Sequence, residues 1–170
     1  VKFFRDNVQF FREQVEKNSD RIVQASNYEE ICQAFDAGKF AAILTVEGGA
    51  ALGGKLEMVD ELRRCGVRML TLTWNGENEL ASGSDTHVGL KPFGVEAVRR
   101  MEELGILVDV SHLNDEGFAD LCKVATKPFI ATHSNSRTIC NHSRNLTDEQ
   151  FCEIRDRGGL VGLNYYRYFI

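Results

Sequence analysis

One pattern recurs along the chain: a short apolar run, a polar or glycine-rich turn, and then an amphipathic helix. The runs predict strands at 21–25, 40–46, 67–73, 106–110, 129–132 and 160–163. They read as nearly continuous apolar segments, which is typical of a parallel sheet buried on both faces. The sequence therefore predicts an α/β fold, and its sheet could be either open and doubly wound or closed into a barrel.

Helix signals separate these runs. We expect helices at 1–17, from 27 to a stop at Gly38, and at 56–65, 93–104, 116–124 and 147–157. Asn27 with Glu30, and Thr147 with Gln150, have the spacing of a capping box. Pro92 suits a first helical position. Glycines at 66, 105 and 158 fall where a helix should end and a strand should begin.

Metal-type ligands follow three of the predicted strands. Glu47 comes directly after the run at 40–46, His112 after the run at 106–110, and His133 after the run at 129–132. Because the carboxyl ends of parallel strands meet at one edge, we expect these side chains to converge. Two imidazoles and a carboxylate suit a hydrolytic metal site. Asp109, between the same strands, is expected to orient a ligand or to cap a strand.

Three further residues are candidates for contact with a substrate. Trp74 opens a long segment, 74–89, of a length that often forms a wall or lid over strand ends, although Trp74 could also pack beneath that loop. Arg144 could hold a carboxylate in a bidentate fork, or could be a surface arginine. Asn145 follows it directly, ahead of a capped helix.

Charge and composition exclude some classes of partner. The formal net charge is −5 and the basic residues form no cluster, which argues against nucleic acid. Since no stretch approaches about 18 consecutive apolar residues, no membrane partner is expected. Five cysteines, an odd count without close pairs, do not resemble a disulfide framework and favour a cytoplasmic location.

Several segments together resemble the membrane (renal) dipeptidase family of zinc peptidases. They are the stretches TVEGG at 45–49, GLKPFG at 89–94, VDVSH at 108–112, ATHSNSR at 131–137 and SRNLTD at 143–148. The resemblance implies a (β/α)8 TIM barrel with two zinc ions. It also implies that Glu47 bridges both ions, that His112 and His133 ligate one of them, and that Arg144 holds the terminal carboxylate of a dipeptide. A hydroxide between the ions would then attack the peptide carbonyl.

The chain also departs from that family. It has no His-x-Asp motif for the other zinc, no later aspartate for the substrate amine, and Trp74 where vertebrate members have histidine. Trp-Asn at this position favours a bacterial-type member. Six strands against the eight of a full barrel lead us to expect one partial barrel domain over 1–170, truncated at both ends, with one zinc site incomplete. Its open edges favour a homo-oligomer.

Two alternatives to a dipeptidase remain at this point. One is another TIM-barrel metallohydrolase of the amidohydrolase type. The other is a non-catalytic remnant of the barrel.

Overall fold

The computed structural model describes residues 2–170. Within them, five short strands form two parallel sheets. In the first sheet β1 (Ile22–Gln24) pairs with β2 (Phe40–Ala42), and in the second β3 (Thr45–Glu47), β4 (Met69–Thr71) and β5 (Leu107–Asp109) lie in sequence order. Parallel neighbours joined by helical crossovers confirm the predicted α/β class.

The strand predicted at 40–46 is two strands, β2 and β3, which belong to different sheets. The prediction of one continuous strand was wrong because its two halves have different neighbours. β2 pairs only with β1 and β3 pairs only with β4. No residue of this run pairs with both β1 and β4. The chain leaves one sheet after Ala42 and enters the other at Thr45, and Ile43 and Leu44 connect the two strands.

The last two predicted strands are present only as isolated parallel bridges, Asp109↔Ile130 and Ala131↔Val161. They continue the second sheet in sequence order, since the Val110 amide donates to the Ile130 carbonyl at 2.8 Å and the Ala131 amide to the Leu160 carbonyl at 3.1 Å. The ladder stops because side chains replace main-chain partners: the Thr132 amide donates to the Asp109 carboxylate at 3.0 Å. A partial barrel with about six parallel strands was predicted; residues 2–170 show five short strands and these bridges, so the six strands are not confirmed.

The helices follow the predicted capping signals closely. They are α1 (Lys2–Lys17), α2 (Tyr28–Asp36), α3 (Glu57–Arg64), α4 (Pro92–Leu104), α5 (Asp115–Val124) and α6 (Asp148–Asp156), with a 3-10 turn η1 (Gly49–Leu52) after β3. The capping box of Thr147 with Gln150 is complete. Gly66, Gly105 and Gly158 all have positive φ at helix ends, as the sequence indicated.

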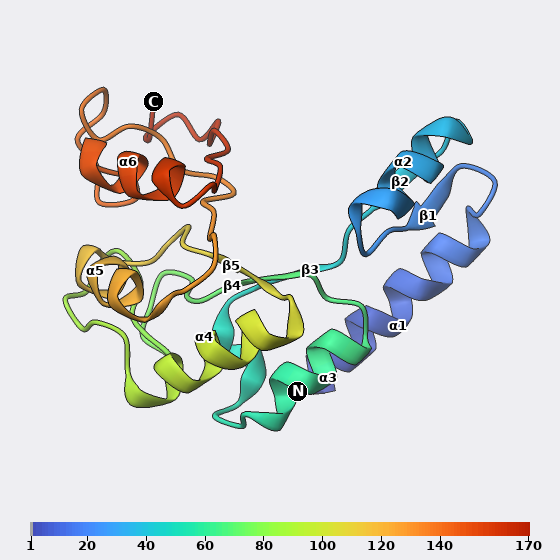
Figure 1. Ribbon diagram of the computed structural model, residues 1–170, viewed down its shortest axis with the longest axis horizontal. Helices are drawn as coiled ribbons and strands as arrows, with labels where there is room; N and C mark the ends of the chain where they lie inside the picture. Colours follow the sequence, from blue (N-terminus) through green and yellow to red (C-terminus); the bar gives the residue numbers. More distant parts are fainter. Residues whose placement is uncertain (1) are drawn as a thin grey trace.

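Figure 1 shows how these elements are arranged around the β3–β4–β5 sheet. The β1–β2 sheet, α2 and most of α1 lie to one side of it, and α5 and α6 lie to the other. α1 reaches back to the centre, where Arg5 pairs with Glu61 of α3 at 2.6 Å. The core lies between the second sheet and α3, α4 and α5, and its fully buried side chains include Leu62, Leu70, Leu121 and Phe129.

Across residues 2–170, no helix combines the length and the apolar character that crossing a membrane requires.

Candidate metal centre

The three predicted ligands meet at the carboxyl edge of the second sheet. Glu47 ends β3, His112 lies three residues after β5, and His133 lies two residues after the bridge at Ala131 and Val161. The Nε2 atom of His112 is 3.1 Å from Glu47 Oε1, and that of His133 is 3.4 Å from the same oxygen. The two Nε2 atoms are 2.9 Å apart. Side chains far apart in the sequence thus form one cluster, the only grouping of this kind within residues 2–170.

These separations suit a single metal ion. Zinc binds imidazole nitrogen and carboxylate oxygen at about 2.0–2.2 Å, so neighbouring ligand atoms on a tetrahedral ion lie roughly 3.3–3.5 Å apart. The three observed separations, 2.9, 3.1 and 3.4 Å, lie at or slightly below that range. Small outward movements of the side chains would bring all three atoms to ligand distance.

The hydrogen bonds of His133 determine which of its nitrogens carries a proton. Its Nδ1 lies 2.7 Å from Thr132 Oγ1, and Thr132 Oγ1 donates its own proton to Asp109 Oδ2 at 2.7 Å. A hydroxyl has only one proton to donate, so Thr132 must accept from His133 Nδ1. When the ring carries only this Nδ1 proton, the Nε2 atom of His133 presents a lone pair to the cluster.

His112 has a similar arrangement on the other side of the cluster. Its Nδ1 lies 3.2 Å from the side-chain oxygen of Asn75, which can only accept a hydrogen bond. The residue has a left-handed backbone (φ 73°), a conformation that costs energy for a side chain of this size and is concentrated at functional sites. Burial, aided by the positive charge of Arg144, lowers the pKa of His112 to about 3. The ring is therefore neutral at physiological pH.

These proton positions leave the centre of the cluster without a donor. His112 Nε2, His133 Nε2 and Glu47 Oε1 are all acceptors within 3.4 Å of one another. Closely packed acceptors repel each other unless a cation lies between them. The residues therefore fit a divalent metal ion, and neutral imidazole with carboxylate is a donor set that zinc accepts.

Asp109 connects the segments that carry the cluster. Its carboxylate is buried and accepts four hydrogen bonds: Oδ1 accepts from the amides of Ser111 and Thr132 at 3.0 Å each, and Oδ2 from the hydroxyls of Thr71 and Thr132 at 2.7 Å each. It thereby joins β4, β5 and the segment that carries His133. The predicted role in orienting a neighbouring ligand agrees with this placement.

Arg144 brings a positive charge close to the cluster. The side chain is buried, with 7% of its surface exposed, and its guanidinium lies 5.5 Å from the centre of the Phe169 ring. Burial lowers the pKa of Arg144, whereas the carboxylates of Asp109 and Glu47 act in the opposite direction. No salt bridge to Arg144 is formed within residues 2–170. The N–H groups of its guanidinium are thus available to bind the carboxylate of a ligand.

Asn145 has a different environment from its neighbour. Its amide nitrogen donates to the carbonyls of Cys140 and Phe169 at 2.9 Å each, and its oxygen accepts from the Asn135 amide at 3.3 Å. With 1% of its surface exposed, it holds the segment around Arg144 against the chain's last residues. Its predicted contact with substrate stays a prediction.

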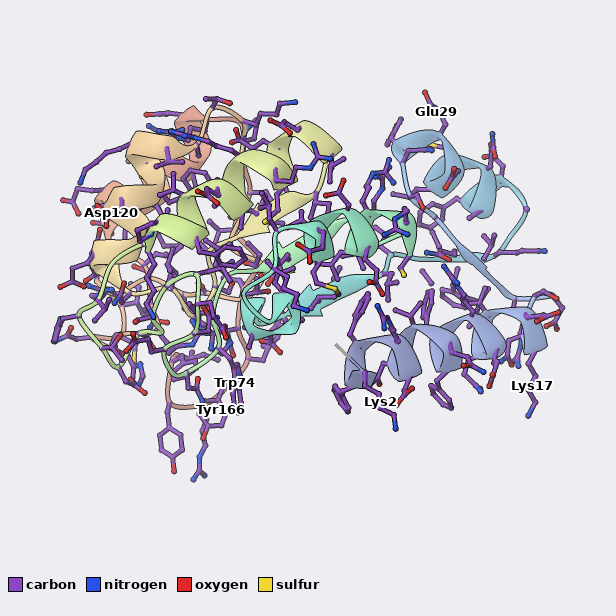
Figure 2. All side chains as sticks on the ribbon, turned by 90° about the horizontal axis from the view of Figure 1, so that it is seen from below. Lys2, Lys17, Glu29, Trp74, Asp120 and Tyr166 are labelled. Atoms are coloured by element: carbon purple, nitrogen blue, oxygen red, sulfur yellow. The ribbon has the colours of Figure 1, made fainter. Side chains whose placement is uncertain are left out.

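Trp74 lies at the surface rather than beneath its loop. Its side chain is 60% exposed and, in Figure 2, lies on the same side of the molecule as Tyr166. Together with Glu47 and Gly48, Trp74 lines a cavity of about 610 Å³ that extends between β3 and the first turns of α1. The outer side of the candidate ligand Glu47 therefore faces an open, largely apolar space.

Sequence reasoning missed two residues of this site, Asn75 and Thr132. Both contact a ligand histidine through its Nδ1 atom. The sequence feature that could have indicated Thr132 is its position directly before His133. There its hydroxyl lies at the same edge of the sheet as the Asp109 carboxylate. For Asn75 the signal was its place directly after Trp74, at the start of the long loop.

Known proteins are similar to this chain over most of its length. A family profile described as membrane dipeptidase (peptidase family M19) matches residues 1–170. An uncharacterized protein from the pqqA 5' region of Klebsiella pneumoniae is 36% identical over 138 residues, which cover 76% of this chain and 51% of that protein.

Two solved structures share the fold. One is described as dipeptidase AC, a metallopeptidase of family M19. It is 29% identical to this chain with a TM-score of 0.91, and the match covers 95% of this chain and 50% of the dipeptidase chain. The other, a metallopeptidase from Rhodobacter sphaeroides liganded with a phosphinate mimic of the dipeptide L-Ala-D-Ala, is 30% identical with a TM-score of 0.88, covering 96% and 48%. The chain thus has an α/β fold that matches TIM-barrel-like dipeptidase structures, and it spans about half the length of these relatives.

The family profile extends from the first residue to the last, and Glu47, His112 and His133 form a group that could hold a metal ion. The chain belongs to the membrane dipeptidase family, peptidase family M19.

Proposed function

We propose that this chain carries the metal-binding and carboxylate-binding half of a zinc-dependent dipeptidase. The observation that carries the proposal is the cluster of Glu47, His112 and His133, whose facing atoms are all acceptors within 3.4 Å. Family membership supports the reaction class, because the similar Rhodobacter sphaeroides metallopeptidase was solved with a phosphinate mimic of a dipeptide. Residues 1–170 are proposed to form one part of a (β/α)8 barrel domain.

The proposed roles follow from the position of each side chain. Glu47, His112 and His133 would hold one zinc ion, and Glu47 would also contribute to binding a second. When bound, zinc lowers the pKa of a coordinated water and polarises the scissile carbonyl. Glu47 is half exposed toward the cavity lined by Trp74, so a substrate can approach it from that side.

Arg144 is proposed to bind the terminal carboxylate of the dipeptide. The Glu47 carboxylate acts to raise the pKa of Arg144, and the charge of Arg144 lowers the pKa of His112, which supports a position of the guanidinium near the cluster. A bidentate bond to the carboxylate would fix the peptide's distance from the metal ligands and so align its carbonyl. Asn145 supports this role by fixing the segment that carries Arg144, and Trp74 is proposed to contact the substrate.

Metal analysis of the purified chain tests the first part of the proposal. We expect stoichiometric zinc in the wild type and its loss in Glu47→Gln, whereas Glu96→Gln, a change on the exposed face of α4, should retain it. Equal zinc in all three proteins would contradict the proposed site. A protein without zinc in any form would favour a non-catalytic remnant.

A substrate panel tests the second part. Dipeptides, their C-terminal amides and cyclic amides would be offered to the zinc-loaded chain, with binding measured by nuclear magnetic resonance alongside hydrolysis. Preference for free dipeptides supports the proposal, and preference for cyclic amides would favour the amidohydrolase alternative. Cytoplasmic location and self-association stay predictions from the sequence.

A further inference from the structure

Asp109, Thr132 and His133 form a continuous series of hydrogen bonds that ends at the candidate metal site. Asp109 Oδ2 accepts from Thr132 Oγ1 at 2.7 Å, and Thr132 Oγ1 lies 2.7 Å from His133 Nδ1. We call this series the Asp109 relay. A carboxylate often orients a metal-ligating histidine directly. Here a threonine hydroxyl stands between them.

We propose that the Asp109 relay fixes the tautomer of His133, so that Asp109 and Thr132 are positioning residues that keep the Nε2 lone pair directed at the metal. This inference rests on the proposed metal site and deepens it. The direction of every proton in the relay follows from its first member, because an ionised carboxylate can only accept. Thr132 must then donate to Asp109 and accept from His133.

The geometry around Asp109 predicts the effect of reversing the direction of the hydrogen bonds in the Asp109 relay. Its Oδ1 accepts two backbone amides, from Ser111 and Thr132, and its Oδ2 accepts two hydroxyls, from Thr71 and Thr132. In Asp109→Asn, the amide oxygen would take the Oδ1 position, since backbone amides require an acceptor. The new NH2 group would occupy the Oδ2 position and would donate to both hydroxyls.

Such a variant keeps four hydrogen bonds and nearly the same shape, yet reverses the relay. Thr132 Oγ1 would accept from the new NH2 group and would turn its own proton toward His133 Nδ1. His133 would then carry its proton on Nε2, where the metal must bind. We therefore expect Asp109→Asn to fold while losing metal affinity by about 10- to 100-fold, the range for lost support of a ligating histidine.

Thr71 offers a matched control. Its hydroxyl donates to the same Oδ2 atom over the same 2.7 Å, but it has no contact with His133. Thr71→Val removes a hydrogen bond from Asp109 without breaking the relay, whereas Thr132→Val breaks it. Thr132→Ser restores the hydroxyl and should restore the relay.

The experiment measures two quantities on the purified chain. Zinc affinity is measured by competition with a chromophoric chelator. The tautomer of His133 is read in the metal-free protein from long-range ¹H–¹⁵N correlations of labelled histidine. We expect the Nδ1–H form in the wild type, Thr71→Val and Thr132→Ser, and the Nε2–H form in Asp109→Asn. Affinity should fall in Asp109→Asn and Thr132→Val far more than in Thr71→Val.

The outcomes separate the relay from the proposed function. If the wild type binds zinc and Thr132→Val resembles Thr71→Val in both affinity and tautomer, the relay is wrong and the metal site stands. If the wild type binds no zinc while the tautomer follows Asp109 and Thr132 as described, the relay stands and the proposed function fails. An Nδ1–H tautomer in Asp109→Asn would overturn the inference whatever the affinity.

Discussion

The Nε2 atoms of His112 and His133 lie 2.9 Å apart, although in neutral rings the hydrogen bonds at Nδ1 leave both atoms without a proton. Glu47 adds a third acceptor to the same space. The metal-free site is consequently a source of instability that a cation would remove. That instability can be measured on the purified chain.

The first prediction concerns the stability of the metal-free chain. Glu47→Gln replaces one acceptor by an amide that can donate to an imidazole Nε2, so it should raise the metal-free free energy of unfolding by about 1 kcal/mol. Zinc at 100 times its dissociation constant should add about 2.7 kcal/mol to the wild type and nothing to the variant. Denaturant unfolding with and without zinc measures both effects. A variant less stable than the metal-free wild type would contradict the acceptor arrangement.

The second prediction concerns acid stability. The pKa of His112 is lowered from 6.5 to about 3, mainly by burial. Between these two values the unfolded chain binds a proton that the folded chain does not. Stability from this group is therefore complete above pH 6.5 and is lost as the pH falls toward 3, with a limiting slope of about 1.4 kcal/mol per pH unit.

His112→Asn is the appropriate comparison for this slope, because asparagine tolerates the left-handed backbone at position 112. Denaturant titrations of the metal-free proteins between about pH 4 and 6.5 should give a shallower pH dependence in the variant. Parallel curves for the two proteins would show that His112 is not held neutral by the fold.

The third prediction concerns Arg144. Because its guanidinium is buried and forms no salt bridge within residues 2–170, we expect it to bind the carboxylate of a dipeptide. Arg144→Lys keeps the charge but loses the bidentate geometry, so dipeptide affinity should fall by roughly 10- to 100-fold, the equivalent of about one charge-assisted hydrogen bond. Dipeptide amides, which lack the carboxylate, should bind equally weakly to both proteins. A loss for the amide as large as that for the dipeptide would indicate general damage to the site.

The sequence was sufficient to predict the helices because their ends carry local signals. Pro92 begins α4, Thr147 and Gln150 complete a capping box, and Gly105 ends α4 with positive φ. Each signal acts over a few residues and does not depend on the rest of the fold. The convergence of the three candidate ligands was predicted for a related reason, since parallel strands bring their carboxyl ends to one edge wherever the strands pair.

The extent of the strands could not be predicted, because it depends on side chains distant in sequence. The run at 129–132 has the composition of a strand, but the Thr132 amide bonds to Asp109 instead of a neighbouring carbonyl. The supporting residues Asn75 and Thr132 escaped prediction for the same reason: their contacts with His112 and His133 exist only after folding. The local sequence pattern is enough to predict the candidate ligands, whereas the residues that hydrogen-bond to them are determined by tertiary contacts.

The fourth prediction concerns Gly49, two residues after the ligand Glu47. A Cβ atom at this position would lie 2.6 Å from the main-chain oxygen of Leu72 and 2.9 Å from the side chain of Leu80, both parts of the buried core. Gly49→Ala must therefore displace η1 from Leu72, which directly follows β4, and from Leu80. We expect it to lower the free energy of unfolding by about 1–3 kcal/mol.

The same displacement should weaken metal binding, because the turn that follows Glu47 is held by the Gly49 amide, which donates to the Leu72 carbonyl at 3.1 Å. Gly76→Ala is the matched control, since a Cβ there meets nothing within 4 Å. That change should leave zinc affinity as it is and should alter stability by less than about 1 kcal/mol. If Gly49→Ala bound zinc as tightly as Gly76→Ala despite lower stability, the position of Glu47 would be set by β3 alone, independently of the turn that follows it.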